Sequence, residues 1–152
     1  MTFGEVPSEV AVSFDSYKEG LSRAWLQDEV VSVMYVPQTV TLPRRLAFRY
    51  IKIELLGSSP YYDFNIHDMK CMAQTSAQNI PEELPQAVDP MIRKIDRVGL
   101  NTLKECMQTV YEDGPKRDQR LWIGDLYLEA LGNNYSYKQH DLTTVSYTHL
   151  RL

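Results

Sequence analysis

The segment from Asp113 to Asp125, reading DGPKRDQRLWIGD, concentrates the side chains of this chain that could do chemistry. It holds three aspartates, two arginines, a lysine and a tryptophan. Carboxylates and guanidinium groups form hydrogen bonds with hydroxyl groups, and an indole face packs on the apolar C–H surface of a ring. Together, these side chains are suited to bind a sugar. Paired carboxylates across a scissile bond also carry out glycoside hydrolysis.

A helix is the element that would position these side chains. Asp113 is a capping residue type, and Pro115 suits the first helical position because its missing N–H costs nothing there. At about 100° per residue, one face of the helix would be acidic and another apolar. The acidic face would carry Asp118, Trp122, Asp125 and Glu129, and the apolar face would carry Ile123, Leu126, Tyr127, Ala130 and Leu131. On spacing alone, such a charged helix start is more often a solvated N-terminus than a site.

The same run resembles the catalytic-domain signature of bacterial α-L-rhamnosidases, which are inverting glycoside hydrolases with a six-hairpin (α/α) barrel. The pieces DGPKRD and RLWIGD carry the specific part of this resemblance. It covers about residues 29–142, through TLPRRLAFRYIKIELLGSSP and DRVGLNTLKECMQTVYE before the motif and LYLEALGNNYSYKQHDL after it. The part before the helices is a weaker match than the motif itself.

The resemblance implies roles for five residues of this chain. Asp113 stands where relatives bond rhamnose hydroxyls, and Asp125 would also bond the substrate. Asp118 stands where relatives carry the acid that protonates the leaving oxygen, often a glutamate. Arg117 would orient carboxylates or bond the sugar, and Trp122 would form an apolar wall of the pocket. The alternatives are purely structural roles: a helix cap for Asp113, surface charges for Arg117 and Asp125, and core packing for Trp122. Glu129 has no clear role in the motif.

An inverting mechanism needs a second carboxylate, about 6.5–9.5 Å from the acid, to activate a water. In the resembled family this general base comes from a later part of the barrel, and so we expect it outside this chain. The expectation is therefore an internal fragment that is inactive alone. Its expected partners are the remainder of the barrel and a rhamnosyl glycoside or polysaccharide. The rival hypotheses are another hydrolase or lyase on the same barrel, and a non-catalytic carbohydrate-binding module.

The pattern along the chain predicts an α+β protein in two parts. Residues 1–76 are expected to be the C-terminal part of an antiparallel β-sandwich, with strands over 30–36, 46–55 and 62–73. Residues 77–88 would form a linker, and residues 89–142 would begin the (α/α)6 barrel, with a first helix from Pro90 to about Tyr111. The final TTVSYTHLRL departs from the family, and residues 143–152 are expected to be a non-native tail of the kind found in metagenomic assemblies.

Composition excludes several classes of function for the 152-residue chain. A net charge of −4 argues against a nucleic-acid partner, and no apolar run is long enough for a membrane helix. Neither the scattered histidines nor Cys71 and Cys106 have the spacing of a metal site, and we expect no metal and no cofactor. The N-terminus lacks the basic start and apolar core of a secretory signal, which favours the bacterial cytoplasm.

Overall fold

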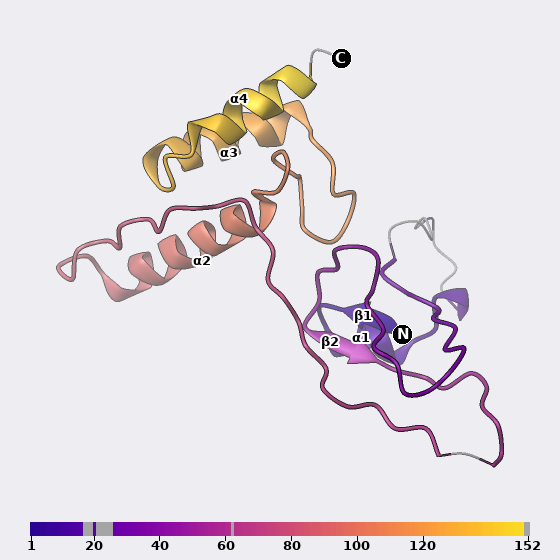
Figure 1. Ribbon diagram of the computed structural model, residues 1–152. Coiled ribbons are helices and arrows are strands. Elements are labelled where there is room, and N and C mark those ends of the chain that lie inside the picture. Colours follow the sequence, from indigo (N-terminus) through magenta and orange to yellow (C-terminus); the bar gives the residue numbers. More distant parts are fainter. Residues whose placement is uncertain (17–19, 21–25, 62, 151–152) are drawn as a thin grey trace. The chain divides into compact units, whose positions relative to one another are not determined.

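The computed structural model describes residues 1–16, 20, 26–61 and 63–150. Short-range contacts divide the chain into two compact units, Met1–Ala73 and Gln74–Leu152, each of which is described here by itself. The first unit contains a small sheet and the second contains the long helices (Figure 1). The α+β class expected from the sequence is therefore confirmed. No helix of the described residues is long and apolar enough to cross a membrane.

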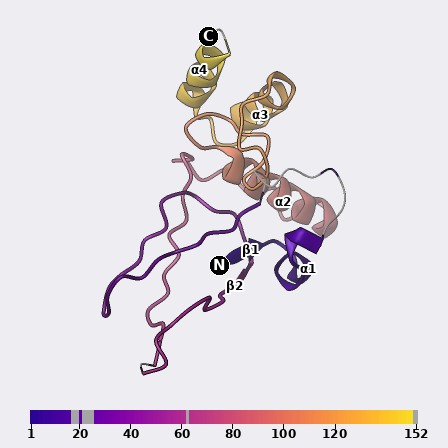
Figure 2. The same ribbon diagram turned by 90° about the vertical axis from the view of Figure 1, so that its right-hand side faces the viewer.

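Two short antiparallel strands hold the N-terminal unit together. Strand β1 (Thr2–Gly4) pairs with β2 (Tyr50–Lys52), and Phe3 lies opposite Ile51. The ring of Phe3 is buried and packs against Phe48 at 5.1 Å between ring centroids. Helix α1 (Pro7–Ala11) contacts both strands and is followed by the 3₁₀ turn η1 (Phe14–Ser16) (Figure 1, Figure 2).

Gly4 permits the close approach of α1 to this sheet. A Cβ atom at this position would lie 2.9 Å from the Cβ of Glu9, closer than two carbon atoms normally approach. A larger residue would push the helix away from the strand. The absence of a side chain at the end of β1 therefore sets how α1 sits on the pair of strands.

The prediction of strands over 30–36 and 62–73 is wrong for the described residues. Of the region 46–55, only Tyr50–Lys52 is a strand. Large apolar side chains in these segments stay exposed, among them Val30 at 80% and Met34 at 85%. β-Branched and aromatic residues favour a strand only where a neighbouring strand takes up the backbone hydrogen bonds. The α+β class stands, whereas the sandwich and the barrel remain predictions.

Three helices form the second unit. Helix α2 (Pro90–Cys106) begins as predicted, because the Asp89 carboxylate accepts the backbone N–H of Met91 at 2.7 Å. It ends five residues before the predicted Tyr111, where the chain turns back and Met107 pairs with Tyr111. Helix α3 (Ile123–Tyr135) contacts α2 and also α4 (His140–His149).

The core of this unit lies where the ends of the helices meet the turn after α2. Its buried side chains are Met107, Tyr111, Leu126, Tyr137 and Leu142. The outer half of α2 takes no part in it. The apolar stripe predicted on that half remains exposed, with exposed fractions between 53% and 64% for Met91, Ile92, Ile95 and Val98.

Hydrogen bonds attach the start of the predicted linker 77–88, and the residue before it, to the helical unit. The backbone N–H of Ser76 donates to the carbonyl of Met107 at 2.8 Å. Farther along, the side-chain amide of Asn79 donates to the carbonyl of Tyr137 at 2.7 Å. These bonds fix the start of the segment to the turn after α2 and to the connection between α3 and α4.

The C-terminal residues 143–149 continue helix α4. Ser146 is fully buried, and its hydroxyl accepts the backbone N–H of Tyr111 at 3.0 Å. The hydroxyl groups of Thr143 and Tyr111 lie 2.9 Å apart. A segment of any origin can pack in this way, and the expectation that residues 143–152 are non-native stays a prediction. Residues 151 and 152 lie outside the described part of the chain.

Candidate functional site

The motif begins with a closed loop, and the prediction that a helix starts at Pro115 is wrong. Residues 115–118 form a turn, and regular helix begins only at Ile123. Asp113 closes the loop on its own. Its backbone N–H donates to the carbonyl of Arg120 at 2.9 Å, and its Oδ1 accepts the N–H of Arg120 at 3.1 Å. The carboxylate expected to cap a helix therefore binds the far side of a loop.

A second contact fixes the inside of this loop. Gln119 has a positive φ of 52°, and its side-chain amide donates to the carbonyl of Pro115 at 2.6 Å. A left-handed backbone is unfavourable for glutamine and persists because the surrounding bonds hold it. The loop therefore presents Arg117 and Asp118 from a shape that is fixed at both ends.

The five predicted site residues lie on this loop and on the first turn of α3. Asp113 and Asp118 are half-buried in the loop, and Arg117 is exposed. Trp122 stands directly before α3 with half of its surface exposed, and Asp125 is exposed in the first turn. The indole is therefore not a core residue, and Asp118 is not enclosed in the packed interior.

The predicted division of one helix into an acidic and an apolar face is only partly correct. Asp125 and Glu129 share α3, but Asp118 and Trp122 precede it. On the expected apolar face, Leu126 is buried and Ala130 packs against the core. Ile123, Tyr127 and Leu131 remain exposed. The reason is that α3 begins eight residues later than expected, and its neighbours cover a single narrow stripe.

Glu129 is the residue whose importance the motif did not reveal. Its Oε2 is buried and has no hydrogen-bond partner among the described residues. Burial, followed by the negative charge of Asp125, raises the pKa of Glu129 from 4.5 to about 7. A side-chain hydrogen bond with Cys106 opposes this rise. The one signal in the sequence was its spacing, four residues after Asp125 on the same helix.

Cys106 lies at the end of α2 beside this carboxyl. Burial and the charge of Glu129 raise the pKa of the thiol to about 12, with smaller contributions from Glu112 and Asp113. The thiol is therefore a neutral hydrogen-bonding group and not a nucleophile at ordinary pH. The charges of Asp113 and Glu112 also raise the pKa of Glu129, by less than burial and the charge of Asp125 do.

In the described part of the chain, these side chains are not arranged as a metal site. A set of three or more histidine, cysteine, aspartate or glutamate side chains placed for a metal ion was not found there. The carboxyl groups can instead accept hydrogen bonds from hydroxyl groups, and the half-exposed indole of Trp122, directly before α3, offers an apolar ring face. This arrangement suits a polyhydroxylated ligand.

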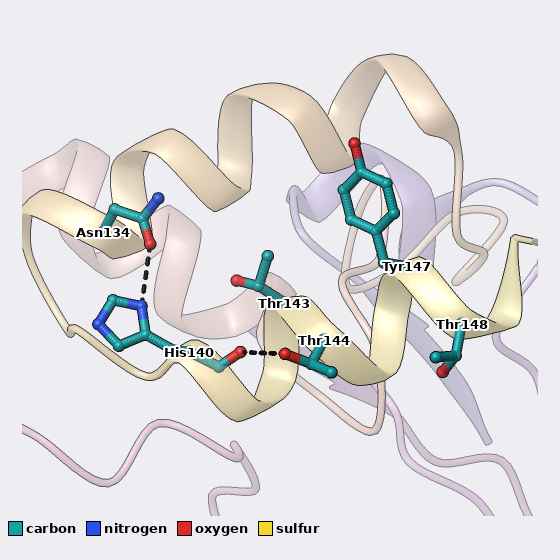
Figure 3. Close-up of a pocket in the computed structure, with 6 residues that line it drawn as sticks. All are labelled: Asn134, His140, Thr143, Thr144, Tyr147 and Thr148. Atoms are coloured by element: carbon teal, nitrogen blue, oxygen red, sulfur yellow. Dashed lines mark hydrogen bonds between the residues drawn. The ribbon is translucent and has the colours of Figure 1, made fainter.

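A separate pocket of about 570 Å³ lies between the end of α3 and helix α4 (Figure 3). A hydrogen bond of 3.1 Å joins the His140 ring to the side chain of Asn134 on one side of it. Its lining is Asn134, His140, Thr143, Thr144, Tyr147 and Thr148. None of the predicted site residues lines this pocket. Most of the lining falls within the expected non-native tail, and we assign it no role.

Comparison with known proteins shows what the chain is similar to. Residues 1–73 match the family model described as the glycosyl hydrolase family 78 alpha-rhamnosidase N-terminal domain. The resemblance to α-L-rhamnosidases, which are glycoside hydrolases, is confirmed. This match falls on the part of the chain whose sequence resemblance was the weaker one.

A particular relative is the rhamnosidase from Klebsiella oxytoca, whose structure was solved with rhamnose bound. It is 42% identical in sequence, and its structure superposes with a TM-score of 0.88 over 95% of this chain. The matched part is 28% of the length of that rhamnosidase. None of the curated proteins compared with the chain matches it significantly.

Proposed function

We propose that this chain carries the rhamnose-binding and acid-bearing part of an α-L-rhamnosidase site. The complete reaction would hydrolyse terminal α-L-rhamnosyl groups with inversion. The observation that carries the proposal is the 42% identity, over nearly the whole chain, to a rhamnosidase solved with rhamnose bound. The exposed indole of Trp122 beside the carboxylates of the loop and of α3 supports the same proposal.

Each proposed role fits the local chemistry. Asp113 binds the backbone of Arg120 through Oδ1, and a carboxylate has further lone pairs with which to accept a sugar hydroxyl. Asp125 would accept a second hydroxyl. The ring of Trp122 would cover the apolar face of the sugar.

Asp118 would protonate the leaving oxygen, and Arg117 would orient the substrate or a neighbouring carboxylate. A general acid must hold its proton until the bond breaks and must lie within reach of the leaving oxygen. The fixed loop would serve this step, because small errors in the position of a catalytic group cost rate.

We propose that the chain by itself binds rhamnose without hydrolysing it. An inverting reaction needs a general base on the opposite face of the sugar. Asp113, Asp118 and Asp125 all have roles on the side of the acid, and none is proposed as that base. An aryl α-L-rhamnoside mixed with the purified chain should therefore release no phenol above the uncatalysed rate. Release at an enzyme-like rate would contradict this part of the proposal.

Calorimetric titration with L-rhamnose tests the binding site. We expect weak binding, with a Kd of about 1 mM, and a decrease of at least about tenfold in affinity for Trp122→Ala. Tyr127→Ala is the matched control, because Tyr127 is an aromatic residue on α3 with a comparable exposed surface. Its affinity should equal that of the unaltered chain. Binding that survives Trp122→Ala would favour the rival hypothesis of a carbohydrate-binding module with its site elsewhere.

A further inference from the structure

The segment of residues 74–79, here called the strap, forms no helix or strand and is nevertheless bound to the helical unit along its length. At its start, the carbonyl of Gln74 accepts the side-chain amide of Gln108 at 3.0 Å. Near its end, the backbone N–H of Gln78 donates to the side chain of Gln139 at 3.0 Å, and the amide of Gln139 donates back to the carbonyl of Ser76 at 2.8 Å. A flexible spacer would leave these polar groups in water.

The middle of the strap caps the C-terminus of α2. The last carbonyl groups of a helix have no partners within the helix and need donors from elsewhere. The hydroxyl of Thr75 lies 2.7 Å from the carbonyl oxygen of Lys104 and 3.1 Å from that of Met107. Ser76 donates to the same Met107 carbonyl from its N–H at 2.8 Å and from its hydroxyl at 3.1 Å. The strap therefore fixes the carbonyl of the residue at which α2 ends.

Met107 is also the first residue of a hairpin that leads towards the motif. The hairpin is closed by the pairing of Met107 with Tyr111, and the N–H of Glu112 donates to the carbonyl of Cys106 at 3.0 Å. Met107 and Tyr111 are both fully buried. Because the hairpin is short and closed by backbone bonds, a shift of its first residue is carried to its last.

Asp113 follows this hairpin directly. Its N–H and its carboxylate both bind the backbone of Arg120, at 2.9 Å and 3.1 Å, and so close the loop that carries Arg117 and Asp118. A continuous path of hydrogen bonds and short backbone therefore runs from the strap, through the end of α2 and the hairpin, to the first residue of the proposed site.

We propose that Thr75 and Ser76 are positioning residues of the rhamnose site, which hold Asp113 in place through the carbonyl of Met107 and the hairpin. The inference rests on the proposed function. Neither residue needs to touch the sugar. Without the two hydroxyls, the end of α2 loses donors that its carbonyl groups need, and the hairpin and the loop can open while the helices stay folded.

The affinity for L-rhamnose tests this inference. Thr75→Val combined with Ser76→Ala removes both hydroxyls and should weaken binding about fivefold or more. Thr75→Ser keeps the hydroxyl and should bind within about twofold of the unaltered chain. The matched control is Tyr137→Phe, which removes a hydroxyl that donates to the carbonyl of Leu100, within α2, at 2.9 Å. It should keep its affinity. A double variant that binds like the unaltered chain, or an equal loss in Tyr137→Phe, would overturn the inference.

A measurement without sugar separates this inference from the proposed function. Hydrogen exchange of the backbone amides of Asp113 and Arg120, followed by NMR, should become about tenfold faster in the double variant. The reference is the amide of Ser136, which donates to the carbonyl of Gly132 at 3.0 Å at the far end of α3. A general loss of stability would speed all three amides by one factor, as expected for Tyr137→Phe.

The ratio of these exchange rates is decisive for the strap. Exchange at Asp113 and Arg120 that rises relative to Ser136 in the double variant, and returns to the original ratio in Thr75→Ser, would support its role. An unchanged ratio in the double variant would refute it. If rhamnose binds to no form of the chain, the proposed function fails, and the exchange ratio alone decides whether the strap holds the loop.

Discussion

At the scale of single residues, burial is the largest cause of the raised pKa of Glu129, followed by the charge of Asp125 on its own helix. Asp113 and Glu112, which precede the helix, add smaller contributions. The sequence placed Asp113, Asp118 and Asp125 in one motif because that motif is contiguous. It grouped Glu129 with Asp118 and Asp125 on one acidic helix face but gave it no role, because the burial of its carboxyl depends on how the elements pack.

The raised pKa of Glu129 predicts a loss of stability as the pH rises. In the unfolded chain this carboxyl ionises near 4.5, and in the folded chain it ionises near 7. Between these values the unfolded state binds fewer protons than the folded state. The stabilisation is therefore complete below about 4.5 and is lost as the pH rises to about 7. After a discount for partial exposure, the loss amounts to about 1–2 kcal/mol.

Urea denaturation of the unaltered chain and of Glu129→Gln at a series of pH values measures this loss. The free energy of unfolding of the variant, relative to the unaltered chain, should increase across this pH window and stay constant above it. Other carboxyl groups titrate equally in both proteins and cancel in the difference. A difference that does not change with pH would show that Glu129 ionises as it does in the unfolded chain.

At the scale of elements, local signals located helix α2 but not the start of α3. Asp89 and Pro90 form a cap that needs only its own first turn, and the structure contains it. Asp113 and Pro115 offer the same residue types two positions apart. The Asp113 carboxylate instead accepts the N–H of Arg120, seven residues later. A capping residue that finds a partner across a loop no longer starts a helix, and sequence spacing does not distinguish the two outcomes.

Two leucines on α3 provide a matched test of where this helix is buried. Leu126 is 1% exposed in the core of the helical unit, whereas Leu128 is 67% exposed. Leu126→Ala should lower the free energy of unfolding by about 2–5 kcal/mol, because it removes buried methyl groups and leaves a cavity. Leu128→Ala should change it by less than about 0.5 kcal/mol. Urea denaturation followed by circular dichroism gives both values, and equal losses would contradict the described orientation of α3.

At the scale of the whole molecule, the prolines near residue 80 and the change from β-branched to helical patterning predicted domains at 1–76 and 89–142 joined by a linker, and these bounds stay a prediction. The structure consists of two compact units, Met1–Ala73 and Gln74–Leu152. The β-rich segments of the first unit are mostly irregular. A strand needs a neighbouring strand, and composition alone does not show whether one is present. The helices needed no such partner, because their hydrogen bonds are internal.

Two compact units with separate cores should lose their structure in separate steps. Phe3 is buried against Phe48 in the unit Met1–Ala73, and Leu126 is buried in the unit Gln74–Leu152. Phe3→Ala should destabilise the first unit by about 3–5 kcal/mol, and Leu126→Ala should destabilise the second by about 2–5 kcal/mol. If the two units unfold independently, each substitution should leave the stability of the other unit unchanged.

Backbone amide resonances of the two units, followed by NMR during urea denaturation, would report the two transitions separately. Phe3→Ala should shift to lower urea only the midpoint for residues 1–73. Leu126→Ala should shift only the midpoint for residues 74–150, and Leu128→Ala should shift neither. If either buried substitution moved both midpoints together, the units would unfold as one cooperative body. The proposed rhamnose site, whose residues all belong to the helical unit, would then also depend on the stability of the small sheet.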